Sequence, residues 1–226
     1  IDSRDGVGFE MWTRTLDGDG VPSMTLQRLT TSTGAAAHPA LTRASDGTLL
    51  AGYVHDNTTM GATREAFVST LASAGTLSGS WTRVSSADEL ASQLGLVPGQ
   101  TSGFLSGWID EAGAVRVRQV TLAGAPTGST VTHGPSNTLG LDGTVLVFSR
   151  NAGFDALWAQ AITAAGDPEG VLRSALTADA TGREPSVAPL SGGVVVAYRH
   201  TTTDGTFIAL SLLNSRGERV HTEVLG

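Results

Sequence analysis

The sequence predicts an all-β protein, and its glycine content and an internal repeat are the two observations behind that expectation. The chain of 226 residues contains 29 glycines against 8 prolines. The glycines are scattered among short apolar runs, a distribution typical of many tight turns. Only Asp88–Leu96 offers a candidate turn or two of helix, because no other segment keeps helical apolar spacing.

One unit recurs five times: a glycine turn, an apolar run ending in an aromatic residue, a polar loop, a second apolar run and another glycine turn. The aromatic residues, at spacings of 41, 55, 40 and 50, are Trp12, Tyr53, Trp108, Phe148 and Tyr198. The second turn glycines, at spacings of 41, 49, 42 and 51, are Gly34, Gly75, Gly124, Gly166 and Gly217. A period in the forties with several short strands per unit predicts the blades of a β-propeller.

We therefore expect a single β-propeller domain of five blades, each with about four antiparallel strands. The expected repeat units are 1–37, 38–86, 87–134, 135–178 and 179–226. The aromatic residue lies on the second strand of each unit, strand b, and the first unit leaves no room for a strand before it. Its fourth strand is not recognisable either, so the first blade is expected to be incomplete. A β-sandwich or a β-solenoid would show similar turns, but the near-constant period favours the propeller.

Composition excludes several classes of function. A net charge of −7 and the absence of a basic stripe argue against nucleic-acid binding. The chain has no cysteine, which excludes disulfides, thiol catalysis and cysteine-based zinc sites. No apolar run approaches the 18 residues of a membrane span. Because the chain opens with Ile1 and shows no signal peptide, we expect a processed or excised piece of a longer precursor.

Five polar residues are the candidate ligand-binding set, because each lies two positions after an aromatic residue and so shares its face of the strand. They are Arg14, His55, Asp110, Arg150 and His200. On one interpretation they form a ring that binds sugar or anionic groups near the face carrying the b–c loops. On the other, they mark the point where each strand leaves the core, and the aromatic residues are core rather than site.

Other motifs carry less chemistry. Asp17-Gly18-Asp19-Gly20 resembles the start of a calcium loop, but it also fits the b–c hairpin turn that follows strand b, and the later ligands of an EF-hand are absent. No nucleophile elbow or phosphate-binding glycine loop occurs. The acids Asp110, Glu111, Asp155 and Glu184 lie near expected loops, and nothing pairs two of them. The sequence therefore names no catalytic residue, no cofactor and no metal beyond Asp17 and Asp19.

The last two units carry a resemblance to a known class of protein. The segments ALWAQAITAAGDPEG and REPSVAPLSGGVVVAYRH resemble the propeller repeats of bacterial secreted and cell-surface proteins. In size and blade number the chain is also similar to small five-bladed lectins. The resemblance implies an extracellular or cell-surface location and a role in binding.

Three functions remain open. The first is a non-catalytic extracellular binding or scaffold module whose partner is a protein or a missing portion of the parent chain. The second is a lectin that binds a glycan. The third is a five-bladed glycoside hydrolase, ranked last because it would need acids on the innermost strands. The sequence expected there, PALTRA, QLGLV, NTLGL and PSVAPL, contains none.

Overall fold

The computed structural model describes residues 9–31, 34–57, 63–87, 89–151, 155–175 and 181–225, with backbone alone at positions 57, 150, 151 and 155. These residues form strands, turns and bends, and none of them is helical. The helical turn expected at Asp88–Leu96 is therefore wrong, since residues 89–93 are irregular and 94–98 form a strand. Within the described ranges, no helix could cross a membrane.

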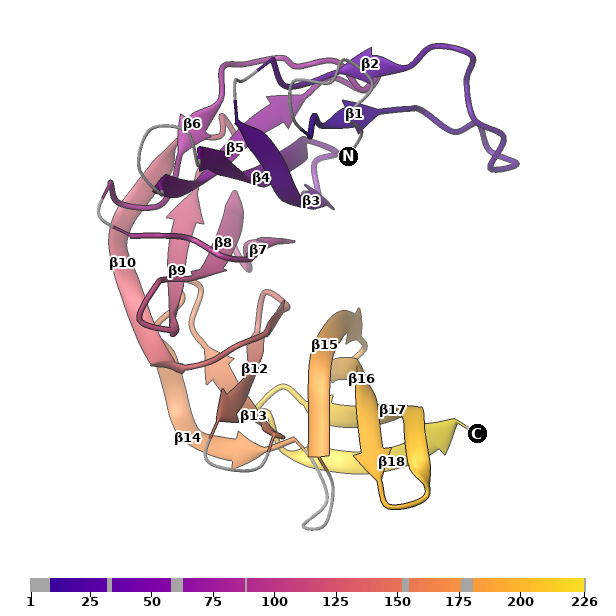
Figure 1. Ribbon diagram of the computed structural model, residues 1–226, viewed down its shortest axis with the longest axis vertical. Helices are drawn as coiled ribbons and strands as arrows, with labels where there is room; N and C mark the ends of the chain where they lie inside the picture. Colours follow the sequence, from indigo (N-terminus) through magenta and orange to yellow (C-terminus); the bar gives the residue numbers. More distant parts are fainter. Residues whose placement is uncertain are drawn as a thin grey trace.

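Four antiparallel sheets of four strands each follow one another along the chain and confirm the predicted propeller. We letter the strands of each blade a to d in chain order, with strand d on the outer rim, as β10 and β14 show in Figure 1.

Blade 2 comprises β3 (Ala35–Arg43), β4 (Leu49–Asn57), β5 (Thr63–Leu71) and β6 (Thr82–Arg83). Blade 3 comprises β7 (Leu94–Pro98), β8 (Phe104–Ile109), β9 (Ala114–Val120) and β10 (Pro126–Pro135). Blade 4 comprises β11 (Leu139–Leu141), β12 (Val145–Asn151), β13 (Asp155–Ile162) and β14 (Pro168–Ser174). Blade 5 comprises β15 (Thr181–Leu190), β16 (Gly193–Thr202), β17 (Gly205–Asn214) and β18 (Arg219–Leu225).

A fifth, partial blade precedes these four. Blade 1 is a two-stranded sheet of β1 (Trp12–Thr13) and β2 (Gln27–Arg28). The described blades lie along an arc, and Figure 1 shows an opening between blade 1 at one end and blade 5 at the other. The incomplete first blade is therefore present as expected, although its strands are not the ones predicted.

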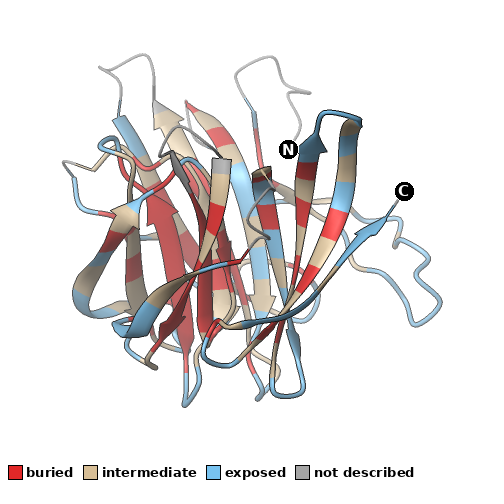
Figure 2. Cartoon of the chain, turned by 90° about the horizontal axis from the view of Figure 1, so that it is seen from below, coloured by how far each residue is buried: buried red, intermediate tan, exposed pale blue. Residues whose placement is uncertain are grey.

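The core consists of one apolar cluster at each junction between neighbouring blades. The burial of strand b explains why the clusters lie between the blades. From Gly193 to His200 in β16, alternate side chains are buried and the others are half-buried, so both faces of the strand are covered to some extent. The aromatic residues that mark the repeat, Tyr53, Trp108, Phe148 and Tyr198, are buried and pack toward the preceding blade. Figure 2 shows buried residues concentrated in the middle of the arc and an exposed β18 at its end.

The two strands of blade 1 were expected to be strands b and c of the repeat. They are instead strands c and d, so the first repeat unit starts later in the blade than predicted. Trp12 pairs with Arg28 as Phe67 pairs with Arg83 in blade 2, and every such pair of positions is offset by 55 residues. The same offset relates the isolated bridges Leu16↔Pro22 and Leu71↔Leu77. Trp12 is thus the counterpart of Phe67 and not of Tyr53.

Hydrogen bonds repeat with the same offset. The Leu29 amide donates to the Met11 carbonyl at 2.8 Å, and the Val84 amide donates to the Ala66 carbonyl at 2.9 Å. An ion pair between Glu10 and Arg28 corresponds to one between Glu65 and Arg83. The turn glycine of blade 1 is therefore Gly20, not Gly34, and the strands missing from the described blade are a and b.

The c–d turns fix the spacing between blades. In blades 2 to 5, each turn contains a glycine with positive φ that lies against strand c of the preceding blade, and two of these glycines leave little room for a Cβ atom. A Cβ at Gly75 would meet Thr13 at 3.2 Å, and one at Gly166 would meet Val117 at 2.6 Å. Because Gly75 contacts β1 as Gly166 contacts β9, this packing is independent evidence that β1 is a strand c.

Two innermost strands contain a bulge that the sequence did not predict. His38 on β3 has φ of 48° and Glu184 on β15 has φ of 54°, and each residue is followed by proline. The register shifts between Ala37 and Ala40 on β3, and at the matching point of β15. Strand a of blade 5 begins at Thr181, ahead of the expected segment PSVAPL, and it continues through the bulge. It therefore includes Glu184, and the expectation that the innermost strands contain no acid is wrong.

Replacing Gly166 with alanine tests the packing of the c–d turns. Gly166→Ala should lower the free energy of unfolding by about 2–4 kcal/mol, since it adds overpacking against Val117 to the cost of positive φ. Gly170 is the matched control, because its φ is also positive but nothing lies within 4 Å. Gly170→Ala should cost only about 1–2 kcal/mol. Equal losses in urea denaturation would show that the turns do not depend on close packing.

His133 gives the fold a dependence on pH. Burial lowers the pKa of His133, against the hydrogen bond to Gly166 and the charge of Asp167, which raise it. His133 therefore binds a proton more readily in the unfolded chain than in the folded one. Its contribution to the free energy of unfolding is complete above about pH 6.5 and is lost as the pH falls toward the pKa of His133 in the folded protein. Denaturation between about pH 7.5 and 5.5 should show this loss, and His133→Gln should reduce it. An unchanged slope in the variant would assign the effect to other groups.

Candidate functional site

The b–c turns and the d–a connections lie at the same ends of the strands and form one face of the arc, here called the b–c face. Three of the five predicted ring residues lie at this end of a strand b or just after it: His55, Asp110 and His200. They belong to three separate blades. Their role in binding a ligand stays a prediction.

The other two ring residues are placed differently. Arg14 follows β1, a strand c that runs away from the b–c face, and its Nε donates a hydrogen bond to the Ser23 carbonyl. Arg14 is therefore not the counterpart of His55. Arg150 lies on β12, but its side chain is outside the described part of the chain.

The two histidines occupy equivalent positions. The ring of each lies edge-on to the aromatic residue two positions earlier, with centroids 6.3 Å apart for Tyr53–His55 and for Tyr198–His200. His200 is buried, with Nδ1 3.3 Å from the Thr181 carbonyl oxygen. Because Tyr53 and Tyr198 are buried as well, they cannot offer their faces to a sugar from solution. Burial raises the pKa of Tyr53 to about 12.

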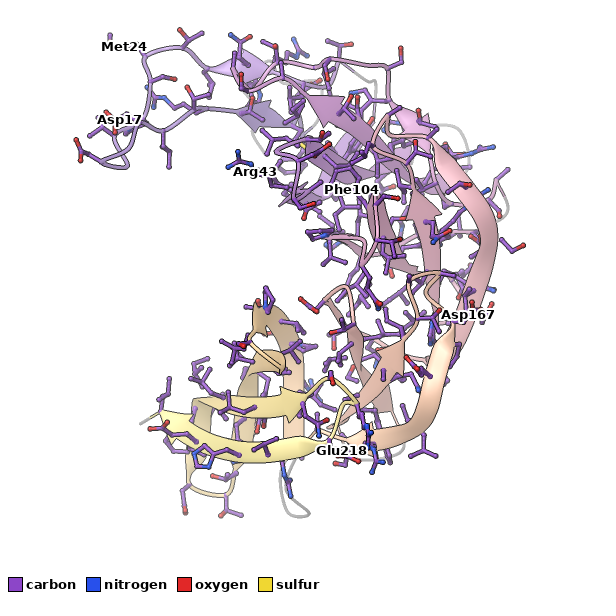
Figure 3. All side chains as sticks on the ribbon, turned by 180° about the vertical axis from the view of Figure 1, so that it is seen from behind. Asp17, Met24, Arg43, Phe104, Asp167 and Glu218 are labelled. Carbon is purple, nitrogen blue, oxygen red and sulfur yellow. The ribbon has the colours of Figure 1, made fainter. Side chains whose placement is uncertain are left out.

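The candidate calcium loop is a c–d turn rather than the expected b–c turn. The Asp17 carboxylate accepts hydrogen bonds from the amides of Asp19 at 3.0 Å and Val21 at 2.8 Å, so it closes the turn. Figure 3 shows Asp17 on a connection that projects from the end of the arc. No three acidic or histidine side chains of the described residues gather closely enough to hold a metal ion.

A cluster of charged residues on blade 3, which we call the acid–arginine cluster, is the strongest candidate site. It consists of Glu89, Asp110, Glu111 and Arg116. Arg116 binds one oxygen of Asp110 through Nη2 at 2.7 Å and through Nε at 2.8 Å. Its Nε also lies 3.7 Å from Oε1 of Glu89. Two carboxylates from separate segments therefore meet at one guanidinium.

The surrounding structure holds these groups in place. Asp110 directly follows strand b, and its Oδ1 accepts the Ala114 amide at 2.8 Å, which closes the b–c turn. Glu89 lies on the connection from blade 2 to blade 3, where its Oε2 accepts bonds from Trp108 Nε1 and the Ser86 amide, both at 3.2 Å. The position of each carboxylate thus depends on the packing of two blades.

The cluster lies beside open space. Glu89, Asp110, Glu111 and Arg116 line a cavity of about 420 Å³ together with Ala112. A second cavity of about 360 Å³ shares Asp110 and Glu111 and reaches Arg64 of blade 2 and Asn137 of the next connection. Carboxylates beside a hollow can transfer protons and accept hydrogen bonds from hydroxyl groups, and Arg116 can bind an anionic or hydroxylated group.

The sequence analysis identified Asp110 and Glu111 but missed Glu89 and Arg116. The sequence does carry a signal for Arg116, because a turn that begins at Asp110 places position 116 opposite Trp108 on the neighbouring strand. Glu89 lies in an irregular connection, so no periodicity predicts where it points. Glu184, also near the b–c face, is 63% exposed in its side chain and lies 3.4 Å from Arg199.

The comparisons with known proteins identify the fold. No family model matches the chain, and no curated protein sequence matches it. Among solved structures, it is similar to an α-L-arabinanase from Penicillium chrysogenum complexed with arabinobiose, with a TM-score of 0.59 and 14% identity. That match covers 84% of this chain and 66% of the arabinanase.

Two further solved structures match a large part of this chain. A candidate 6-phosphogluconolactonase from Bacteroides uniformis has a TM-score of 0.56 and 17% identity, over 96% of this chain and 65% of that protein. An exo-β-1,3-galactanase from Phanerochaete chrysosporium has a TM-score of 0.48 and 10% identity, over 94% of this chain and 52% of its own. The chain thus spans just under two thirds of the first two proteins, and the likeness identifies the β-propeller fold.

These comparisons correct the function expected from the sequence. The expected non-catalytic binding or scaffold module, and the expectation that the chain is not an enzyme, are wrong. The similar propellers include a glycoside hydrolase, the arabinanase. The hydrolase alternative fits these findings better, and its last rank rested on innermost strands without acids, whereas β15 contains Glu184.

Replacing Arg116 tests whether the residues of the acid–arginine cluster depend on one another for their contribution to stability. Arg116→Met should lower the free energy of unfolding by about 3 kcal/mol, because it leaves the buried Asp110 carboxylate without its cation. Arg83→Met is the matched control, since Arg83 on β6 also pairs with a carboxylate, that of Glu65 on β5, but is more exposed than Arg116. It should cost less than about 1 kcal/mol in the same denaturation assay. Similar costs would mean that the Asp110 pair behaves as an ordinary surface ion pair.

Proposed function

We propose that this chain is the propeller of a glycoside hydrolase and that the acid–arginine cluster is its catalytic site. The observation that carries the proposal is the cavity beside Glu89, Asp110, Glu111 and Arg116, in which four of the five lining residues are charged. Glycoside hydrolysis typically uses two carboxyl groups, one on each side of the bond that breaks. The likeness to the arabinanase supports the same reaction class and makes arabino-oligosaccharides the first substrates to test.

The residues of the cluster fit distinct roles. Glu89 lines the cavity with its Oε1 3.7 Å from Arg116, and this position suits a base that takes a proton from the attacking water. Glu111 is exposed at the mouth of the same cavity and would donate its proton to the leaving glycosidic oxygen. The water oxygen bonds to the anomeric carbon as the glycosidic C–O bond breaks. Asp110 holds Arg116 and is a positioning residue.

Activity measurements on variants test the proposal. The purified chain should hydrolyse at least one member of a panel of arabino-oligosaccharides and nitrophenyl glycosides. Glu89→Gln and Glu111→Gln should each lower kcat/KM by about 100-fold or more, since a positioned acid or base contributes about 10²–10⁴-fold. Circular dichroism would verify that both variants are folded.

Two further variants serve as controls. Glu65→Gln removes a carboxylate that pairs with Arg83 outside both cavities, and it should leave kcat/KM unchanged. Glu184→Gln removes the acid on the innermost strand of blade 5 and should also leave it unchanged. Activity that disappears only in Glu184→Gln would move the site to the axis and refute the assignment to blade 3. A chain that cleaves no glycoside would refute the function itself.

A further inference from the structure

A cavity of about 430 Å³, here called the arginine cavity, lies where blades 4 and 5 meet, at the strand ends opposite the b–c face. Its volume is in the range of small-molecule sites. The a–b turns of blades 3 and 4, the strands β13 and β14, and the c–d turn of blade 5 form its walls. It shares no residue with the acid–arginine cluster. Its polar lining residues are Gln100, Thr144, Glu169, Arg173, Ser215 and Arg216.

Blade 3 shows how the same position is closed elsewhere in the repeat. Strand d has a bulge in both blades, with φ of 67° at Gly128 and 69° at Gly170, which stand 42 residues apart. By this offset Ala161 is the counterpart of Gln119. The Nε2 atom of Gln119 donates a hydrogen bond of 2.8 Å to the Ala164 carbonyl in the c–d turn of blade 4, so its side chain spans the junction. Alanine at position 161 is too short to do so, and the arginine cavity lies there instead.

The lining of the arginine cavity is charged where blade 3 is apolar. By the same offset Arg173 is the counterpart of Val131. In the c–d turns, Arg216 and Ala165 are counterparts, because each directly precedes the turn glycine of its blade. The packing of the repeat therefore does not require either arginine. Two guanidinium groups have been placed beside a space that the neighbouring junction fills.

The two arginines are held differently. Nη2 of Arg173 lies 2.8 Å from Oε1 of Glu218, whose Oε2 accepts a hydrogen bond of 2.8 Å from Asn214. This hydrogen bond and the charges of the two arginines lower the pKa of Glu218, so its carboxylate is ionised at neutral pH and fixes Arg173 beside the cavity. Arg216 is exposed, and no described residue forms a hydrogen bond or ion pair with its guanidinium group. Its donors can therefore serve a ligand.

The other walls offer complementary groups. Gln100 fixes one side, because its Nε2 donates to the carbonyls of Gly143 at 2.7 Å and Ile162 at 3.0 Å. The carboxylate of Glu169 can accept hydrogen bonds from hydroxyl groups, and in the described structure it forms no ion pair with either arginine. Val171 is 62% exposed and provides an apolar surface. Cationic donors, a separate acceptor and an apolar patch thus surround one space.

We propose that the arginine cavity binds an acidic sugar, a uronic acid unit of a glycan. Its carboxylate binds Arg216 and Arg173, since guanidinium groups match carboxylates in charge and geometry. Its hydroxyl groups donate to Glu169, and the carbon-bound hydrogens of its ring contact Val171. A neutral sugar would leave the arginines without an anion, and a small inorganic anion would leave Glu169 without a donor. The site is independent of the proposed hydrolytic site on the b–c face.

Calorimetric titration with matched disaccharides tests the proposal. The probes are the disaccharides of galacturonate and of glucuronate, each compared with the neutral disaccharide of the same linkage. At least one acidic disaccharide should bind about tenfold or more tightly than its neutral counterpart, because only the acidic one has a carboxylate for the arginines. Equal binding of each pair, or no binding of either acidic disaccharide, would overturn the proposal. Acetate or phosphate that binds as tightly as the uronates would also refute a sugar site.

Variants of the lining locate the binding. Arg216→Met should weaken binding of the acidic disaccharide by about tenfold or more. Arg43→Met is the matched control, because Arg43 is also exposed but lies on blade 2, outside the arginine cavity, and this variant should bind normally. Ala161→Gln gives blade 4 the side chain that closes the junction in blade 3 and should abolish binding without lowering the Tm.

Native affinity in Arg216→Met would place the ligand elsewhere and refute the assignment. The same conclusion would follow from native affinity in a folded Ala161→Gln variant. Because the assay measures binding and not cleavage, its result is separate from that of the hydrolase experiments.

Discussion

The structure depends on one constraint, which is that each blade is a sheet with two apolar faces and can bury them only against its neighbours. The apolar clusters lie between the blades, and each joins residues of two consecutive sheets. A single four-stranded sheet would leave both of its apolar faces in water. The glycine turns of blades 2 to 5 serve the same constraint, because they let the c–d turn approach strand c of the preceding blade.

The candidate site is built from these same parts. Asp110 closes the b–c turn of blade 3 and also binds Arg116, so the turn and the acid–arginine cluster are one structure. Glu89 reaches the cluster from the connection between blades, where the indole of buried Trp108 donates a hydrogen bond to it. The side chain that anchors the blade in the core therefore also orients a carboxylate at the surface.

The sequence predicts the strands well because their signals are local. Glycine turns and an aromatic residue at the end of strand b mark blades 2 to 5, and Tyr53, Trp108, Phe148 and Tyr198 are buried as expected. The phase of the first unit could not be predicted from its aromatic residue, since tryptophan suits strand b and strand c equally. Trp12 was therefore matched to Tyr53 instead of Phe67. The partnership of Glu89 with Arg116 depends on an irregular connection, which follows tertiary packing and not periodicity.

The opening in the arc changes how the molecule responds to stress. A closed ring has no first or last blade, so all its junctions must fail together, whereas an open arc behaves as a linear array with two ends. Among the described residues, blade 1 contributes two short strands, and the apolar cluster of blade 5 lies on the face toward blade 4. Local unfolding should therefore begin at these two ends and reach blade 3 last. Amide protection would then decrease outward from the blade that carries the acid–arginine cluster, so that the cluster sits on the most persistent part of the protein.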